Sequence, residues 1–190
     1  MAKPREVMGW YEWYIKMAQH VKLKSKDPST QVGNVVVGPD MEIRSAGFNG
    51  FPRGVDDDIE ERWERPDKYK WVSHGEENSV LQAARIGVSL VGCTMVFDCE
   101  PTPCDRCANG IVQSGIKYVV GPTTKFTGHG NNGSGWDKDC SIGTQKLIEG
   151  GVKIILIDEK TFKIVDVKGN WTTQEKRKLF AMKRPNHWRL

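Results

Sequence analysis

The pattern of apolar residues at the start of the chain predicts a helix followed by a β-hairpin. From Trp10 to about Lys24, apolar side chains recur at intervals of three and four residues, which is the spacing of one helix face. Residues 32–37 are β-branched and apolar, and a Gly-Pro-Asp turn separates them from the alternating residues 42–46. We therefore expect two antiparallel strands after the first helix.

The later apolar segments alternate between predicted helices and predicted strands. Helices are expected over 76–86, 104–113 and 142–149, and strands over 94–97, 117–120, 153–157 and 163–167. Near the C-terminus, the Thr172-x-x-Glu175 pattern predicts a capping box before a short basic helix. This alternation predicts an α/β fold of three layers, in which helices flank a central mixed sheet.

Two segments lack a regular apolar pattern. Residues 56–71 are acidic and aromatic and are interpreted as a linker, whereas the glycine-rich residues 128–135 are interpreted as a mobile lid or binding loop. Compact domains span 50 to about 250 residues. We therefore expect one domain over residues 1–190, in which residues 158–190 form a C-terminal extension.

The composition argues against a membrane protein and against a dedicated nucleic-acid binder. No apolar run approaches the roughly 20 residues of a membrane span. Residues 1–6 lack the apolar core of a secretory signal, and two of the five cysteines form a Cys-x-x-Cys pair, so a cytoplasmic location is expected. The net charge of +4 suits a small anionic ligand better than a polymer.

The strongest chemical signal combines His74-Gly75-Glu76 with Cys104 and Cys107. This combination is the established signature of zinc-dependent nucleobase deaminases. A catalytic zinc needs three protein ligands from nitrogen and sulfur and a fourth position for water, and one histidine with two cysteines meets that requirement. Both motifs also open predicted helices, whose N-terminal partial charge favours thiolates.

Glu76 is the predicted proton carrier. It lies two residues past His74, close enough to reach a zinc-activated water without being a ligand. In the predicted mechanism, Glu76 takes a proton from this water and the resulting hydroxide attacks the ring carbon that carries the amine. Glu76 then protonates the ring nitrogen and the departing amine, and ammonia leaves.

A structural zinc knuckle is the alternative for these ligands. A closed site of that kind needs a fourth ligand, for which Cys93 and Cys99 are candidates. Both lie in or beside a predicted strand, where a free cysteine usually behaves as a small buried apolar residue. We expect the same structural role for Cys140.

Five motifs resemble the deoxycytidylate deaminase branch of the cytidine deaminase superfamily. They are residues 27–33 (DPSTQVG), 47–54 (GFNGFPRG), 74–78 (HGEEN), 103–107 (PCDRC) and 113–117 (QSGIK). The resemblance extends over roughly residues 10–157. It implies a cytidine-deaminase-like fold with a substrate pocket over the zinc. It also implies a homohexamer that dCTP activates, with Mg²⁺ on the effector, and dTTP inhibits.

The resemblance also implies a set of substrate-binding residues. Asn49 would bind the sugar or base of the nucleotide, and Val32 would form a wall beside the ring. By the same resemblance, Trp136 would cover the pocket. Arg85 and Lys125 are candidates for the phosphate on other grounds, namely their charge and their position at the end of the Glu76 helix and on a loop beside the predicted site. The structural alternatives are a turn position with left-handed backbone for Asn49, solvated surface charges for the cations and core packing for Trp136.

The implied regulatory site contains Lys26, Asp27, Asn49 and Arg53. Arg53 is also a candidate for a substrate phosphate, since its loop lies near the predicted site. For Lys26 and Asp27, the alternative is that they merely end the first helix.

Two departures from the family pattern stand out. Gly75 occupies a position where alanine is usual, which weakens the helix start but leaves the ligands in place. Some viral members carry a second, structural zinc on an insertion before the catalytic histidine, but residues 51–73 contain no cysteine or histidine. We therefore expect one zinc per chain.

The predicted function is zinc-dependent deamination of dCMP to dUMP, which would supply dUMP for thymidylate synthesis. One alternative is deamination of another free nucleotide, namely CMP, dCTP or dAMP. Another is a polynucleotide or tRNA deaminase that uses the cations of the tail, which are Lys176, Arg177, Lys178, Lys183, Arg184 and Arg189. A third is a non-catalytic nucleotide sensor, against which Glu76 argues because a sensor needs no proton carrier.

Overall fold

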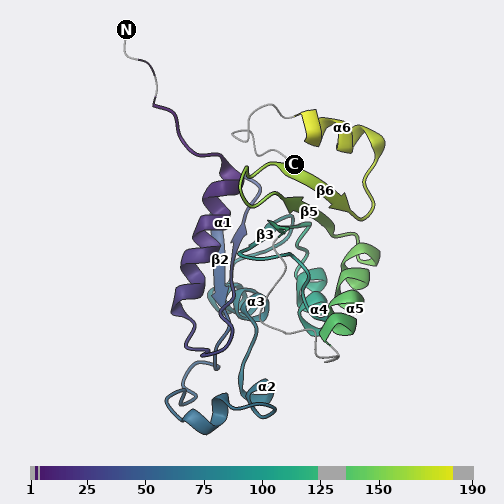
Figure 1. The fold of residues 1–190 in the computed structure, drawn as a ribbon. Coiled ribbons are helices and arrows are strands. Elements are labelled where there is room, and N and C mark those ends of the chain that lie inside the picture. The colour runs from purple at the N-terminus through teal and green to yellow at the C-terminus, as the bar shows by residue number, and fades with distance from the viewer. Residues whose placement is uncertain (1–2, 4, 124–135, 182–190) are drawn as a thin grey trace.

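A mixed sheet forms the middle layer of the molecule (Figure 1). The computed structural model describes residue 3 and residues 5–123 and 136–181, whose strands form one six-stranded sheet in the order β2-β1-β3-β4-β5-β6. The strands are β1 (Gly33–Val37), β2 (Ile43–Phe48), β3 (Thr94–Phe97), β4 (Tyr118–Pro122), β5 (Lys153–Ile157) and β6 (Ile164–Lys168). Strands β3, β4 and β5 run parallel, and the other neighbouring pairs are antiparallel. The expected mixed sheet is confirmed.

Helices cover both faces of the sheet and complete the three layers. Because successive strand residues point to opposite faces, Val35 and Val37 enter one core while Val36 enters the other. The first core is closed by α1 (Trp10–Val21) and α6 (Thr173–Ala181). The second is closed by α3 (Gly75–Ile86), α4 (Asp105–Gln113) and α5 (Trp136–Glu149). Three short elements lie outside these layers: η1 (Lys22–Lys24), η2 (Glu60–Trp63) and α2 (Lys68–Trp71).

The C-terminal residues that the structure describes pack on the same sheet. Strand β6 pairs with β5, and Val167 and Leu179 are buried in the core under α1. The predicted capping box of α6 is present, because the Thr172 hydroxyl accepts from the Glu175 N–H at 3.1 Å and the Glu175 carboxylate accepts from the Thr172 N–H at 2.9 Å. None of the described helices is long and apolar enough to cross a membrane.

Several element boundaries differ from the sequence prediction, most at α5. Helix α5 begins at Trp136, six residues before the expected start at 142, because the first turns are mostly polar and carry no apolar periodicity. Strand β4 extends to Pro122, two residues past its expected end at 120.

The supposed linker at residues 56–71 is a folded excursion that contains η2 and α2. Backbone hydrogen bonds between Gly50 and Ser73, of 3.1 and 2.9 Å, join its two ends. Phe51 stacks on Trp63 with 4.4 Å between ring centroids, and the Arg62 guanidinium lies 4.3 Å from the ring centroid of Trp71. A small aromatic cluster therefore stabilises this segment, and the helical period was hidden because each element spans a single turn.

Candidate functional site

The N-termini of two neighbouring helices bring the predicted metal ligands together. His74 is the N-cap residue of α3, Cys104 is the N-cap residue of α4, and Cys107 lies in the first turn of α4. The His74 Nδ1 atom lies 3.4 Å from each of the two sulfur atoms. All three ligand atoms lie within 4.8 Å of one another. Residues 30 positions apart in the chain thus converge on one point.

This donor set fits a tetrahedral zinc ion. With Zn–N bonds of about 2.0–2.1 Å and Zn–S bonds of about 2.3 Å, a tetrahedral ion separates nitrogen from sulfur by roughly 3.5 Å. Within the described part of the chain, no fourth cysteine, histidine or carboxylate joins the group. Cys93 is buried in the core beneath α3 and α4, and Cys99 lies in the wall of the adjacent cavity. The arrangement therefore fits an open catalytic site better than a closed knuckle.

The electrostatics of the three ligands also fit a bound cation. The contact with Cys107 lowers the pKa of Cys104 to about 4, whereas the same contact, together with burial, raises the pKa of Cys107. Burial acts to lower the pKa of His74, but the contact with Cys104 and the charge of Glu76 raise it to about 9. The thiolates of Cys104 and Cys107 would repel each other if both were ionised. A divalent cation bound to both sulfurs offsets this repulsion and replaces the thiol protons.

Glu76 lies in the first turn of α3 beside the ligands. Its residue is 8% exposed, and this burial raises the pKa of its carboxyl group. A carboxyl group with a raised pKa can both accept and return a proton near neutral pH. Next to it, Glu77 is exposed to solvent. Glu76 is therefore the acid of this turn that faces the site.

A glycine in α5 allows that helix to support the cysteine motif. A Cβ atom placed on Gly143 would lie 2.1 Å from the Pro103 carbonyl oxygen and 2.9 Å from the Cys104 carbonyl carbon. The backbone of α5 thus packs directly against the residues that lead into α4. In addition, the Lys146 ammonium donates to the Asp105 carbonyl at 3.1 Å.

A cavity opens beside His74 and Glu76. It encloses about 760 Å³, a figure that includes open solvent at its mouth. Val32, Phe97 and Val72 supply apolar walls. The other lining residues are Asp27, Thr30, Asn49, Lys68, Tyr69, His74, Gly75, Glu76, Cys99, Glu100 and Thr102. The cavity therefore combines apolar surface for a ring with a few polar groups.

The structure brings two predicted substrate residues to this cavity and places a third elsewhere. Asn49 and Val32 line it. Asn49 is absent from the described non-glycine residues with positive φ, so the alternative of a left-handed turn position is wrong. Arg85 is exposed in the last turn of α3, nine residues past Glu76 and roughly 13 Å along the helix axis. Lys125 lies outside the described residues, as does the side chain of Trp136.

The predicted regulatory residues separate into two groups. Asp27 and Asn49 line the cavity beside Glu76. Lys26 is exposed and pairs with Asp57 at 2.6 Å and Asp58 at 2.9 Å. Arg53 is exposed and contacts Gln82 of α3. Lys26 and Asp27 are thus neighbours in the chain whose side chains have different partners.

Sequence analysis missed the residues that α2 and its flank contribute. Lys68, Tyr69 and Val72 line the cavity. Lys68 is only 4% exposed. Lys68 and Tyr69 lie in the segment interpreted as a linker, and Val72 directly follows it. None of the three gives a periodic signal, and this part of the cavity wall was therefore not predicted.

The glycine at position 75 is explained by the neighbouring strand. Asn34 of β1 pairs across the sheet with Gly47 and Phe97, so its side chain lies on the α3 face. A Cβ atom on Gly75 would lie 2.9 Å from the Asn34 Nδ2 atom. The Asn34 side chain is buried, and its amide atoms have no hydrogen-bond partner among the described residues. Asn34 thus occupies the space that an alanine methyl group at position 75 would require.

A layered α/β fold with His-x-Glu and Cys-x-x-Cys on adjoining helix N-termini defines the class of zinc-dependent deaminases. The model of the cytidine and deoxycytidylate deaminase zinc-binding region matches residues 8–122 of the chain, which include all three ligand candidates and Glu76. The chain belongs to this family.

Individual relatives agree with this assignment. The chain is 38% identical over 117 residues to a probable deoxycytidylate deaminase of Caenorhabditis elegans, a match that covers 57% of this chain and 55% of that protein. It is 33% identical over 130 residues to human deoxycytidylate deaminase, covering 65% of this chain and 70% of the human protein. The dCMP deaminase of cyanophage S-TIM5, solved with dCMP and dUMP, has the same fold, with a TM-score of 0.59, 24% identity and coverage of 77% and 95%.

We expect Cys104→Ser to lose zinc and Cys99→Ser to retain it. Cys104 belongs to the converging group, whereas Cys99 lines the cavity without joining that group. Metal content of the purified variants, measured by mass spectrometry, tests this expectation. Because bound metal stabilises the folded state, the melting temperature should also fall in Cys104→Ser and after chelation. Zinc loss in Cys99→Ser would instead indicate a closed four-ligand site.

We expect Gly75→Ala to destabilise the protein by about 1 kcal/mol, because the methyl group would displace the end of the buried Asn34 side chain. In Asn34→Ala/Gly75→Ala the overlap disappears together with the buried amide, so most of the stability should return. Urea unfolding of the zinc-loaded proteins measures both changes. Gly110→Ala is the control, since open space surrounds that helical position and alanine should stabilise it slightly. An equal cost of Gly75→Ala with and without Asn34 would contradict this explanation.

Proposed function

We propose that this protein hydrolyses dCMP to dUMP and ammonia with one zinc ion bound by His74, Cys104 and Cys107. The observation that carries the proposal is the convergence of these three ligand atoms beside the buried carboxyl group of Glu76, in the wall of a cavity that is open to solvent. Relatives named deoxycytidylate deaminases, at 33% and 38% identity, support dCMP as the substrate. The product would supply thymidylate synthesis.

The residues of the chain divide the chemistry as follows. Zinc, when bound, supplies a Lewis acid that lowers the pKa of a water molecule toward neutrality. Glu76 accepts one proton from the attacking water and passes it to the cytosine ring nitrogen as the carbon–oxygen single bond forms. It then accepts the remaining hydroxyl proton and passes it to the amino group. The bond from the ring carbon to this amino group breaks as the carbonyl double bond forms, and ammonia leaves. Burial of Glu76 excludes bulk water from this proton transfer.

The cavity walls support a role in orienting the nucleotide. Val32 and Phe97 present apolar surface to the pyrimidine ring, and Asn49 lies where it can contact the sugar or the base. Regulation by dCTP, with Mg²⁺ on the effector, and by dTTP is part of the proposal, as is a homohexamer. For these features the support is the family membership alone.

The arrangement of the described cations argues against a polynucleotide substrate. Helix α6, which carries Lys176, Arg177 and Lys178, lies at the opposite end of the molecule from α2 (Figure 1). The cavity is lined by residues of α2, so these three cations are remote from it. The remaining tail cations, Lys183, Arg184 and Arg189, lie outside the described residues. A polynucleotide deaminase would show steep salt dependence of oligonucleotide binding.

We expect Glu76→Gln to lower kcat by about 10²–10⁴-fold while zinc content stays unchanged, because the amide cannot carry the proton. Ammonia release from dCMP measures the rate, and metal analysis shows that the site is loaded. The matched control is Glu77→Gln, because Glu77 is the next residue of the same turn but faces solvent. Full activity of Glu76→Gln would refute the assigned role of this residue.

A panel of dCMP, CMP, dCTP, deoxycytidine and dAMP tests the substrate. We expect dCMP to give the highest kcat/KM, and we expect added dCTP to raise and dTTP to lower the rate. Activity on dAMP without activity on any cytosine compound would refute the proposed substrate while leaving the zinc chemistry in place.

A further inference from the structure

We infer that Lys68 is a positioning residue for the nucleotide site, which it serves by fixing Asn49 through Asp27 and by docking α2 as a wall of the cavity. The inference rests on the proposed function and adds a residue to it. Lys68 contacts neither the ligand group nor Glu76 in any described hydrogen bond or ion pair. Lys68 also lines the cavity, but its ammonium is engaged by Asp27 and Ser29, so its influence would pass through Asp27.

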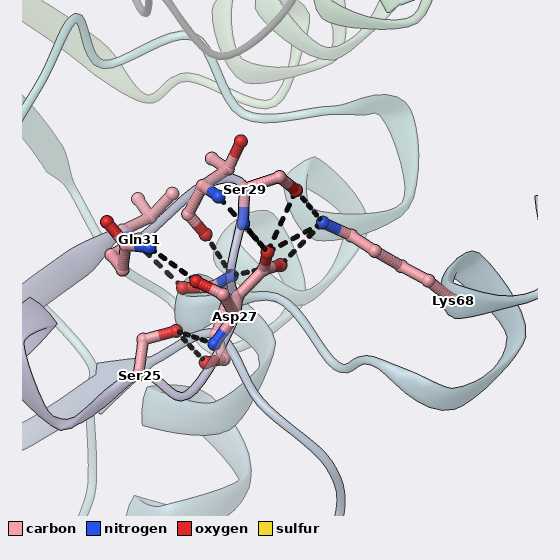
Figure 2. Close-up of polar contacts among 8 residues, drawn as sticks. Ser25, Asp27, Ser29, Gln31 and Lys68 are labelled. Atoms are coloured by element: carbon pink, nitrogen blue, oxygen red, sulfur yellow. Dashed lines mark hydrogen bonds and ion pairs between the residues drawn. The ribbon is translucent and has the colours of Figure 1, made fainter. Parts of the chain in front are cut away.

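Lys68 is held by three buried or partly buried acceptors. Its ammonium lies 2.8 Å from Asp27 Oδ1, 2.7 Å from Asp27 Oδ2 and 2.6 Å from the Ser29 hydroxyl oxygen (Figure 2). The side chains of Lys68 and Asp27 are 5% and 1% exposed, so water screens this ion pair little. Figure 2 shows the lysine stem reaching across from α2 to the loop that precedes β1.

Asp27 connects this lysine to the loop before β1 and to Asn49. Its carboxylate accepts from the backbone N–H groups of Ser29 at 2.9 Å and Thr30 at 3.1 Å, and from Asn49 Nδ2 at 3.1 Å. Burial alone would raise the pKa of Asp27, but the Lys68 ammonium and these N–H donors outweigh it and lower the pKa. The carboxylate thus stays ionised and serves as an acceptor for four residues.

Asn49 is fully oriented by its contacts. Its Nδ2 donates to Asp27 and to the Thr30 carbonyl at 2.8 Å, and its Oδ1 accepts from the Val32 N–H at 2.8 Å. Both amide hydrogens are therefore used, and only Oδ1 retains capacity for a further donor. Because Val32 lines the cavity, the same contacts also position an apolar wall.

The pair also docks α2. This helix has four residues, which is too short to be stable without tertiary contacts. Lys68 is its first residue, and Tyr69 and Val72 beside it line the cavity. Removing Lys68 would leave Asp27 buried without its countercharge, and both the asparagine and the α2 wall would lose their fixed positions.

The test compares Lys68→Met with Lys70→Met. Lys70 lies in the same short helix, but its side chain is 77% exposed and its ion pair with Asp67 lies at the surface. We expect Lys68→Met to raise the KM for dCMP by about tenfold to a hundredfold, with kcat changed less than about threefold and zinc content unchanged. Lys70→Met should match the wild type in all three.

Hydrogen exchange gives a second readout that does not depend on the substrate. We expect faster exchange at the amides of residues 29–32 in Lys68→Met and unchanged exchange in Lys70→Met, since the Val32 and Thr30 amides donate into the network. Unchanged exchange, or an unchanged KM in a folded and zinc-loaded variant, would overturn the inference. A wild-type protein inactive on every nucleotide would refute the proposed function, and the exchange comparison would still decide whether Lys68 orders the loop.

A double variant covers the case in which Lys68→Met fails to fold. Asp27→Asn/Lys68→Met removes both charges and so avoids a buried unpaired carboxylate. We expect this protein to fold, to bind zinc and to retain the raised KM, because an amide at position 27 is a weaker acceptor for Asn49 and cannot anchor α2 by charge. A double variant with the wild-type KM would overturn the inference.

Discussion

The site depends on the close approach of two helix N-termini over one face of the sheet. His74 precedes the first turn of α3, and Cys104 and Cys107 begin α4, so the ligand geometry is only as accurate as the packing of these helices. Gly143 lets α5 contact the cysteine motif, and Gly47 of β2, where a Cβ would lie 2.2 Å from the Gly75 carbonyl oxygen, lets α3 contact the sheet. The metal centre is thus a product of backbone packing as much as of ligand identity.

The cavity wall formed by Asp27, Asn49 and Lys68 is held by different interactions. There the backbone is irregular, and an ion pair and a buried amide replace apolar packing as the means of fixing it. Such polar contacts are directional, which suits a surface that must place single hydrogen-bonding atoms. They also cost more to break than apolar contacts of equal size, because each leaves a buried group unsatisfied.

The sequence alone predicted the sheet, the main helices and the four residues of the chemical motif. The strand and the ligand motif both give strong local signals in the sequence. Examples are the run of Val35, Val36 and Val37 and the spacing from Cys104 to Cys107, which involve residues close together in the chain. Lys68 gave none, because its importance arises from Asp27, 41 residues earlier, and such long-range pairs have no period. The phosphate candidates were chosen from charge and sequence position, and Arg85 shows the limit of that reasoning, since a helix that begins at the site ends away from it. The sequence likewise did not explain why position 75 is glycine, because Asn34, whose side chain faces it, lies 41 residues earlier in the chain.

The aromatic cluster of Phe51, Trp63 and Trp71 has a consequence for how the protein would respond to loss of zinc. In residues 51–73, which contain neither cysteine nor histidine, stacked rings hold the described segment together. Chelators, and oxidants that react with thiolates, would therefore act on Cys104, Cys107 and their metal. They would not act directly on the aromatic contacts of this segment. Removal of the metal would thus leave the ring contacts of this segment without a direct reason to change.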